Sequence, residues 1–209
     1  MCIRGSGINK DDVIVGSTGV IGMPLNLAPI ANGMADLVAG LDYDNSGLAA
    51  EGIMTTDTKK KEVAVSFDID GVECRIGGIA KGSGMIHPNM ATMLVFVTSD
   101  VAITSEMLQK AVSEDVKTSF NMISVDGDTS TNDTFAVLAN GMAGNKLIDS
   151  EGEAYDKFCE ALHKVSVYLS RKIAGDGEGA TKLLECKVTG GKTDAVSYTH
   201  LTLPTKLEV

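Results

Sequence analysis

The sequence predicts a layered α/β domain. Segments with strand periodicity alternate with segments of helical periodicity along most of the 209 residues, an order typical of sheets covered by helices. A hairpin signal, Asp70-Gly71, joins two of the strand segments. With 44% hydrophobic and 22% charged residues, the chain has enough apolar side chains for a substantial core.

Short apolar or alternating runs predict a series of strands. They are expected at residues 12–17, 62–68, 72–79, 93–98, 123–125, 134–139 and 182–188. The second of these alternates most clearly, with Val63, Val65 and Phe67 on one face. The third is its expected partner across the hairpin turn.

Helical spacing of apolar residues predicts helices at residues 25–41, 105–120 and 151–174. Gly33 weakens the first. Thr104 suits the N-cap of the second, because its hydroxyl can accept a backbone N–H of the first turn. The expected core residues of the third are Phe158, Leu162, Val165, Val167 and Leu169.

Composition excludes several function classes. A net charge of −10 argues against nucleic acid or an anionic membrane as partner, although it leaves room for a locally basic pocket. No apolar run approaches the ~20 residues that span a bilayer, and no signal-peptide segment opens the chain. The four cysteines form no CxxC pair, so we expect reduced thiols and a cytoplasmic protein.

The segment 196–209 does not fit the pattern before it. We interpret it as a non-native tail and exclude it from the expected domain, which covers 1–195. An ordinary C-terminal strand is the alternative.

The most informative stretch surrounds Ala91-Thr92, where a glycine-rich loop runs into a strand. Cleavage there would give Thr92 a free amine beside its hydroxyl, the pairing of an activated threonine nucleophile. Gly82 and Gly84 leave room for a ligand or a strained backbone, and Lys81 brings a cation. The alternative is structural, because β-branched residues are common at strand starts.

Other motifs are weak individually. Thr18-Gly19 could supply two donors to an oxyanion, or form a tight turn. Glu178 lies in a glycine-rich segment that could hold a carboxylate in a site, or end a helix. Residues 126–134 lack the ligand pattern of a calcium loop, and the histidines lack metal-ligand spacing.

Together these motifs resemble one family, the bifunctional ornithine acetyltransferases of arginine biosynthesis. The matching blocks are STGVIG at 17–22, IMTTDT at 53–58, GGIAKGSGMIHPNMATML at 77–94, SVDGDTSTNDT at 124–134 and GDGEGATK at 175–182. The resemblance covers about residues 11–194, and the block around Ala91-Thr92 is its most specific part.

The resemblance implies a layered, self-processing fold and the roles of particular residues. The precursor would cut itself between Ala91 and Thr92, which gives an α-chain part (1–91) and a β-chain part (92–195). Thr92 would take an acetyl group from N-acetylornithine and pass it to glutamate. Thr18 and Gly19 match the oxyanion-hole pair. The positions that match substrate contacts are Thr55, Lys81, Thr92 and Glu178.

The resemblance also implies an α2β2 heterotetramer and no cofactor, although some members use acetyl-coenzyme A as donor. The family's chain is about twice as long, so we expect a central fragment, truncated at both ends, with an incomplete pocket. Two alternatives remain open. One is a self-processing amidohydrolase or aminopeptidase with the same threonine nucleophile, and the other is an inactive fragment.

Overall fold

The computed structural model describes residues 9, 11, 13–87, 93–130, 132–193 and 196–197. A four-stranded sheet in the order β1-β2-β3-β4 lies at its centre. The strands are β1 (Lys61–Ile69), β2 (Val72–Lys81), β3 (Leu94–Ser99) and β4 (Thr134–Ala139). The first three pair antiparallel, and β3 pairs parallel with β4. This mixed sheet confirms the predicted α/β class.

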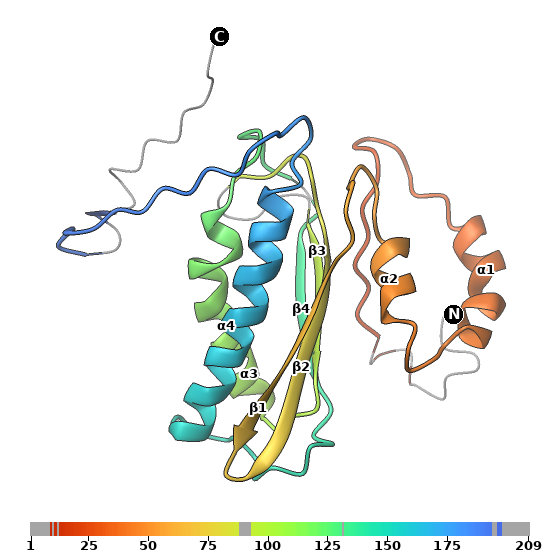
Figure 1. The fold of residues 1–209 in the computed structure, drawn as a ribbon. Helices are drawn as coiled ribbons and strands as arrows, with labels where there is room; N and C mark the ends of the chain where they lie inside the picture. The colour runs from red at the N-terminus through yellow and green to blue at the C-terminus, as the bar shows by residue number, and fades with distance from the viewer. Residues whose placement is uncertain are drawn as a thin grey trace.

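Helices lie on both sides of the sheet (Figure 1). One face is covered by α3 (Ser105–Thr118) and α4 (Glu153–Ala174), and a 3-10 turn, η2 (Phe120–Met122), follows α3. On the other side, α2 (Ser46–Gly52) contacts β1 and β2. The remaining helix, α1 (Ala28–Ala39), lies farther from the sheet.

The hairpin between β1 and β2 forms as predicted. Asp70 and Gly71 have φ values of 52° and 83°, the left-handed geometry that a two-residue turn with the right twist requires. Ile69 pairs with Val72 across the turn. The N–H of Gly71 donates to Oδ1 of Asp68 at 2.9 Å, which satisfies a donor that the ladder cannot reach.

One face of α4 supplies much of the core. Phe158, Leu162, Val165 and Leu169 are fully buried, as predicted, whereas Val167 is only half-buried. They belong to the same apolar cluster as the buried residues of β2 and β3. Helix α3 begins as expected, because Thr104 Oγ1 accepts the N–H of Met107 at 3.3 Å.

Three predicted strands are wrong. Residues 13–17, 123–125 and 182–188 form no strand in the structure, because an apolar run becomes a strand only where a neighbouring strand accepts its backbone hydrogen bonds. The helix predicted at 25–41 is confirmed as α1, but none of its residues is buried. The short helix α2 was not predicted. Within the described residues, no helix combines the length and apolarity needed to cross a membrane.

Candidate functional site

Two of the predicted site residues meet at the end of β2. Lys81 is its last residue and is only 3% exposed. Thr55 comes from the loop between α2 and β1 and is exposed. The Nζ of Lys81 donates to Oγ1 of Thr55 at 3.3 Å. The sheet therefore joins a buried cation to a hydroxyl 26 positions away in the sequence.

Glu178 reaches the same loop from the far end of the chain. Its backbone N–H donates to the carbonyl of Ser83 at 2.7 Å. Its carboxylate lies against Gly84, where an added Cβ would come within 2.9 Å of the carboxylate carbon. A larger residue at position 84 would push the Glu178 carboxylate away from this position. Glu178 itself is exposed, so its carboxylate is open to a ligand.

Burial dominates the electrostatics of Lys81. Removal from water lowers the pKa of its ammonium below the usual value, and the nearby Lys61 lowers it further. The carboxylates of Asp57, Asp133 and Glu178 oppose this shift. A buried cation that is incompletely compensated is suited to bind a carboxylate ligand.

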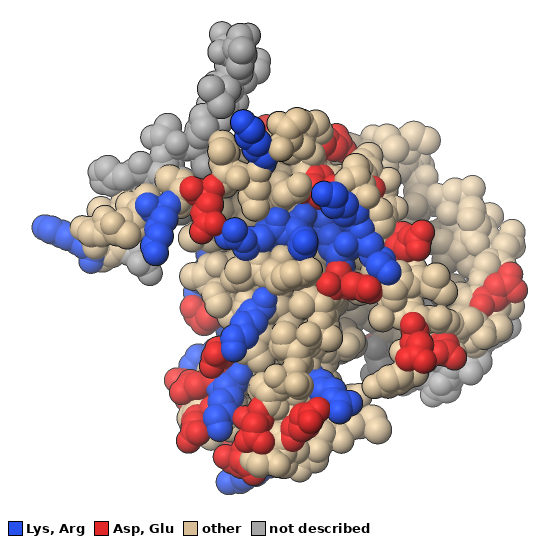
Figure 2. All heavy atoms as spheres, in the orientation of Figure 1, with Lys and Arg blue, Asp and Glu red and all other residues tan. Residues whose placement is uncertain are grey.

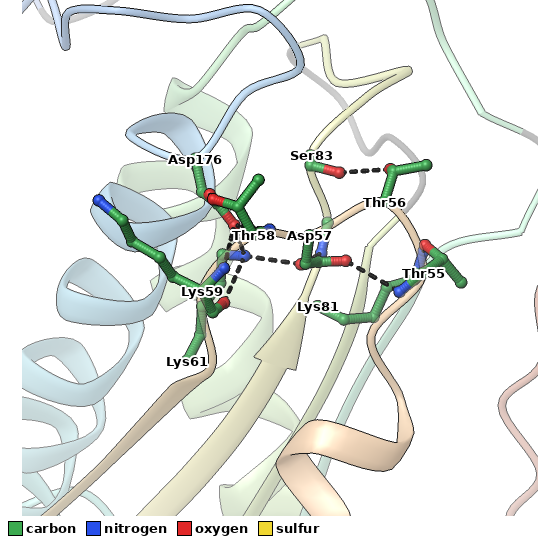
Figure 3. Close-up of polar contacts among 10 residues, drawn as sticks. Thr55, Thr56, Asp57, Thr58, Lys59, Lys61, Lys81, Ser83 and Asp176 are labelled. Carbon is green, nitrogen blue, oxygen red and sulfur yellow. Dashed lines mark hydrogen bonds and ion pairs between the residues drawn. The ribbon is translucent and has the colours of Figure 1, made fainter.

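A buried ionic network lies beside these residues (Figure 3). The Nζ of Lys61 donates to Oδ1 of Asp57 and to Oδ2 of Asp176, at 2.6 Å each. Asp57 also accepts the N–H of Gly82 at 2.7 Å and that of Thr55 at 3.2 Å. The network thus joins the loop before β1, the loop after β2 and the end of α4.

Asp176 is anchored as firmly as Asp57. It accepts the hydroxyl of Thr58, the N–H of Thr58 at 3.0 Å and the N–H of Lys59 at 3.2 Å. Burial alone would raise the pKa of Asp176, but the bonds from Lys61 and Thr58 outweigh it and hold the pKa below its usual value. The pKa of Asp57 is lowered in the same way, because bonds from Gly82, Lys61 and Thr55 outweigh burial.

The loop after β2 is fixed by the polar segment 126–134. Asp126 accepts the N–H of Met85 at 2.5 Å and that of Ile86 at 2.9 Å, and the N–H of Val125 donates to the carbonyl of Ile86 at 2.8 Å. The Asp126 side chain therefore caps the backbone of the loop after β2. Among the described residues, no group of carboxylates, histidines and cysteines could hold a metal ion.

Ala91 and Thr92 lie outside the described residues. The residue that follows them is firmly held: Met93 is 2% exposed. Its N–H donates to Oδ1 of Asp133 at 3.0 Å, and its carbonyl accepts the N–H of Thr134 at 3.0 Å. The chain is therefore anchored at the residue directly before β3.

Thr18 and Gly19 belong to an irregular segment beside the sheet. Thr18 is half-buried and Gly19 is exposed. Gly16, two residues upstream, packs so closely on Phe96 that an added Cβ would lie 2.8 Å from its ring, and 3.4 Å from Thr134 Oγ1. In the described part of the chain, no hydrogen bond joins the predicted oxyanion pair to the three substrate-site candidates.

Basic side chains gather near the end of α4. A hollow of about 410 Å³ there is lined by residues that include Lys59, Lys60, Arg171 and Lys172, and Figure 2 shows lysines and arginines forming a band on this face. Much of this charge is already paired, since Arg171 bonds Glu185 and Lys60 lies near Glu62. Cations in the last turn also stabilise a helix.

Sequence reasoning missed four residues of this region: Asp57, Lys61, Asp133 and Asp176. Three of the four lie within blocks already singled out, 53–58, 124–134 and 175–182. For Asp57, Lys61 and Asp176 the missing signal was burial of a charged side chain, which the sequence does not reveal. The structure therefore adds to the predicted site the charged side chains that hold its loops in place.

The ArgJ family model matches residues 2–200. Arginine biosynthesis bifunctional protein ArgJ 1 of Clostridium acetobutylicum is 52% identical over 186 residues, which cover 89% of this chain and 46% of that protein. Arginine biosynthesis bifunctional protein ArgJ of Symbiobacterium thermophilum is 51% identical over 187 residues, or 90% and 46% of the two chains.

A crystal structure of arginine biosynthesis bifunctional protein argJ from Bacillus halodurans also matches. It shares 46% identity over 42% of this chain and 41% of its own, with a TM-score of 0.40. The chain spans about half the length of the curated relatives it matches.

Proposed function

This chain belongs to the ArgJ family, and we propose that it carries the nucleophile-bearing part of an acetyltransferase of arginine biosynthesis. The enzyme transfers an acetyl group from N-acetylornithine to glutamate through an acetyl-threonine intermediate. The observation that carries this proposal is the convergence of Thr55, Lys81 and Glu178 on the loop that leads to Ala91-Thr92. These side chains suit a small zwitterion.

Self-cleavage comes first in the proposed sequence of steps. The Thr92 hydroxyl adds to the carbonyl carbon of Ala91, the C–N bond breaks, and the amine of Thr92 takes up a proton. Water then opens the resulting ester, which leaves a carboxylate on Ala91 and a free hydroxyl and amine on Thr92. Support comes from the residue that follows Thr92 in the chain, because the backbone of Met93 is held by hydrogen bonds to Asp133 and Thr134.

Acetyl transfer then uses the new terminus. The Thr92 amine accepts the hydroxyl proton while the hydroxyl oxygen attacks the acetyl carbonyl of N-acetylornithine. Thr18 and Gly19 donate to the oxyanion of the tetrahedral intermediate. The amine returns the proton to ornithine, which leaves. The amino group of glutamate then attacks the acetyl ester, so that N-acetylglutamate forms and Thr92 regains its proton.

The three converging residues, Thr55, Lys81 and Glu178, orient the substrate. Lys81 pairs with the carboxylate of the substrate, and Glu178 pairs with its free amino group. Thr55, which already accepts from Lys81, lines the same position. Holding both charged ends of one small molecule places its acetyl group for attack and removes orientational entropy from the reaction.

Assembly and location are part of the proposal. We expect the protein to form an α2β2 heterotetramer in the cytoplasm, to need no cofactor, and to act without nucleic acid or membrane partners. Cys74, Cys159 and Cys186 are free, which supports a reducing compartment. Acetyl-coenzyme A is the alternative donor, and replacing N-acetylornithine by it in the assay tests that use.

Expression of the protein from its complete gene tests the function. Intact mass and N-terminal sequencing are expected to show two chains, the second beginning at Thr92. Acetyl exchange between N-acetylornithine and glutamate is expected in the wild type and in the exposed-threonine control Thr98→Ala, and neither cleavage nor exchange in Thr92→Ala. An uncut, fully active protein would refute the cleavage step. Transfer to water alone would favour the amidohydrolase.

A further inference from the structure

Lys61 occupies the centre of the buried network beside the proposed site. Its side chain is 1% exposed, and those of Asp57 and Asp176 are 0% and 4% exposed. Both ion pairs measure 2.6 Å between nitrogen and oxygen. Figure 3 shows the Lys61 ammonium between the carboxylates of Asp57 and Asp176, one on either side of it.

The two carboxylates stand in related positions. Asp57 follows Thr55 by two residues, and Asp176 precedes Glu178 by two residues. Each ion pair therefore holds in place an aspartate that lies two residues from a proposed substrate contact. Lys61 is the group common to both ion pairs.

The third proposed contact is tied to the same network. Gly82, which follows Lys81, donates its N–H to Asp57 at 2.7 Å. The N–H of Thr55 donates to the other oxygen of Asp57 at 3.2 Å. Asp57 thus holds the backbone of Thr55 and of the residue after Lys81, and the side chains of Thr55 and Lys81 meet at 3.3 Å.

Stability alone is a poor reason to keep three buried charges. Desolvation of such a group often offsets its Coulomb attraction, and apolar replacements of similar volume are frequently neutral or stabilising. A buried ionic group is useful where it enforces one geometry. Here the ionic network holds together the loop before β1, the loop after β2 and the end of α4. The backbone hydrogen bonds of the sheet do not fix these three segments.

We propose that Lys61 is a positioning residue that sets the separation between the Thr55–Lys81 side and the Glu178 side of the substrate site. This inference rests on the proposed function, because it assigns Lys61 a role in orienting the same substrate. Lys61 acts through Asp57 and Asp176, not on the reacting atoms. Self-cleavage, which needs no substrate contact, does not depend on it.

Kinetics of the protein expressed from its complete gene test the proposal. In Lys61→Met, self-cleavage is expected to reach completion, while kcat/KM for N-acetylornithine falls on the order of 100-fold, mainly through KM. Asp176→Asn keeps the shape and one ion pair, and a smaller rise in KM is expected. The control is Lys60→Met, which removes an exposed neighbouring charge and is expected to leave KM unchanged.

The outcomes separate this inference from the function on which it rests. A wild type that neither cleaves nor exchanges acetyl groups refutes the proposed function. A wild type that does both, beside folded Lys61→Met and Asp176→Asn variants with unchanged KM, overturns the role of Lys61 alone. Folding is checked by circular dichroism. If even Asp176→Asn fails to fold, the network serves stability and the positioning role is equally overturned.

Discussion

The carboxylate of Asp133 accepts the backbone N–H of Met93 at 3.0 Å. Asp133 lies directly before β4, and Met93 lies directly before β3, so this bond ties the two parallel strands together where both begin. Burial raises the pKa of Asp133, although the Met93 N–H and the ammonium of Lys81 oppose the shift. One side chain thus connects the start of β3 to the electrostatics of Lys81.

Replacement of Asp133 is expected to slow self-cleavage. Asp133→Ala removes the acceptor that anchors Met93, and the freed backbone is expected to reduce the cleavage rate about 10-fold or more, since small misplacements of reacting groups are costly. Asp133→Asn keeps an oxygen at the same position and is expected to restore most of the rate. Time-resolved intact mass of the newly made protein measures both.

Asp128 provides the matched control for this comparison. It is an exposed aspartate in the same polar loop, and Asp128→Ala is expected to cleave at the wild-type rate. Equal rates in Asp133→Ala and the wild type would show that the bond to Met93 does not position the cleavage junction.

Lys81→Met is expected to stabilise the protein while abolishing acetyl exchange. The Lys81 ammonium is buried, and its lowered pKa reflects the loss of water. An apolar side chain of similar length removes that penalty, so the free energy of unfolding is expected to rise by about 1 kcal/mol. Urea denaturation measures the change.

Exposed Lys146 supplies the control, because Lys146→Met is expected to change stability by less than about 0.5 kcal/mol and to leave exchange intact. A Lys81→Met protein that is both destabilised and fully active would contradict the role given to this cation.

Acid is expected to weaken the fold through Asp57 and Asp176. Both folded-state pKa values lie below the ordinary 3.8. Their contribution to stability is therefore complete above that value and is lost as pH falls through the lower folded-state pKa values. The stability difference between the wild type and Asp57→Asn is expected to be constant from pH 7 to about 5 and to shrink below about pH 4.

Urea titrations at a series of pH values give this difference directly. Glu160→Gln is a suitable control, since the Glu160 carboxylate also has a lowered pKa but lies on the surface with Lys164. Its effect on stability is expected to stay small at every pH. A difference between wild type and Asp57→Asn that grows in acid would contradict the ionised, hydrogen-bonded state of Asp57.

Local sequence signals correctly predicted turns, helix caps and those strands that have a neighbouring strand to pair with. The Asp70-Gly71 turn and the Thr104 cap appear as expected, because each depends on residues close in the chain. The strand at 134–139 also appears, because β3 lies beside it and pairs with it. The strand expected at 182–188 did not form. Its apolar residues satisfy the local pattern, but a strand also needs a neighbouring backbone, and sequence periodicity carries no information about that neighbour.

For the candidate site, too, the sequence predicted some features and not others. The motifs marked Thr55, Lys81 and Glu178 individually, and the chemistry of each could be stated from its side chain. The sequence could not predict that these residues meet, because Glu178 reaches Ser83 and Gly84 only after α4 has packed on the sheet. Lys61 is the clearest omission: in the sequence it is the last of three lysines, and nothing there distinguishes a solvated charge from a buried one.

The sequence by itself therefore determined the α/β class, the hairpin, the family and the residue types available for the proposed acetyl transfer, all of which follow from local pattern or motif order. Tertiary structure alone decided which charges are buried and which distant loops share a hydrogen bond. The physical reason is that desolvation and ion pairing depend on what surrounds a side chain in space. Asp57, Lys61 and Asp176 acquire their common role only when β1 and the end of α4 meet.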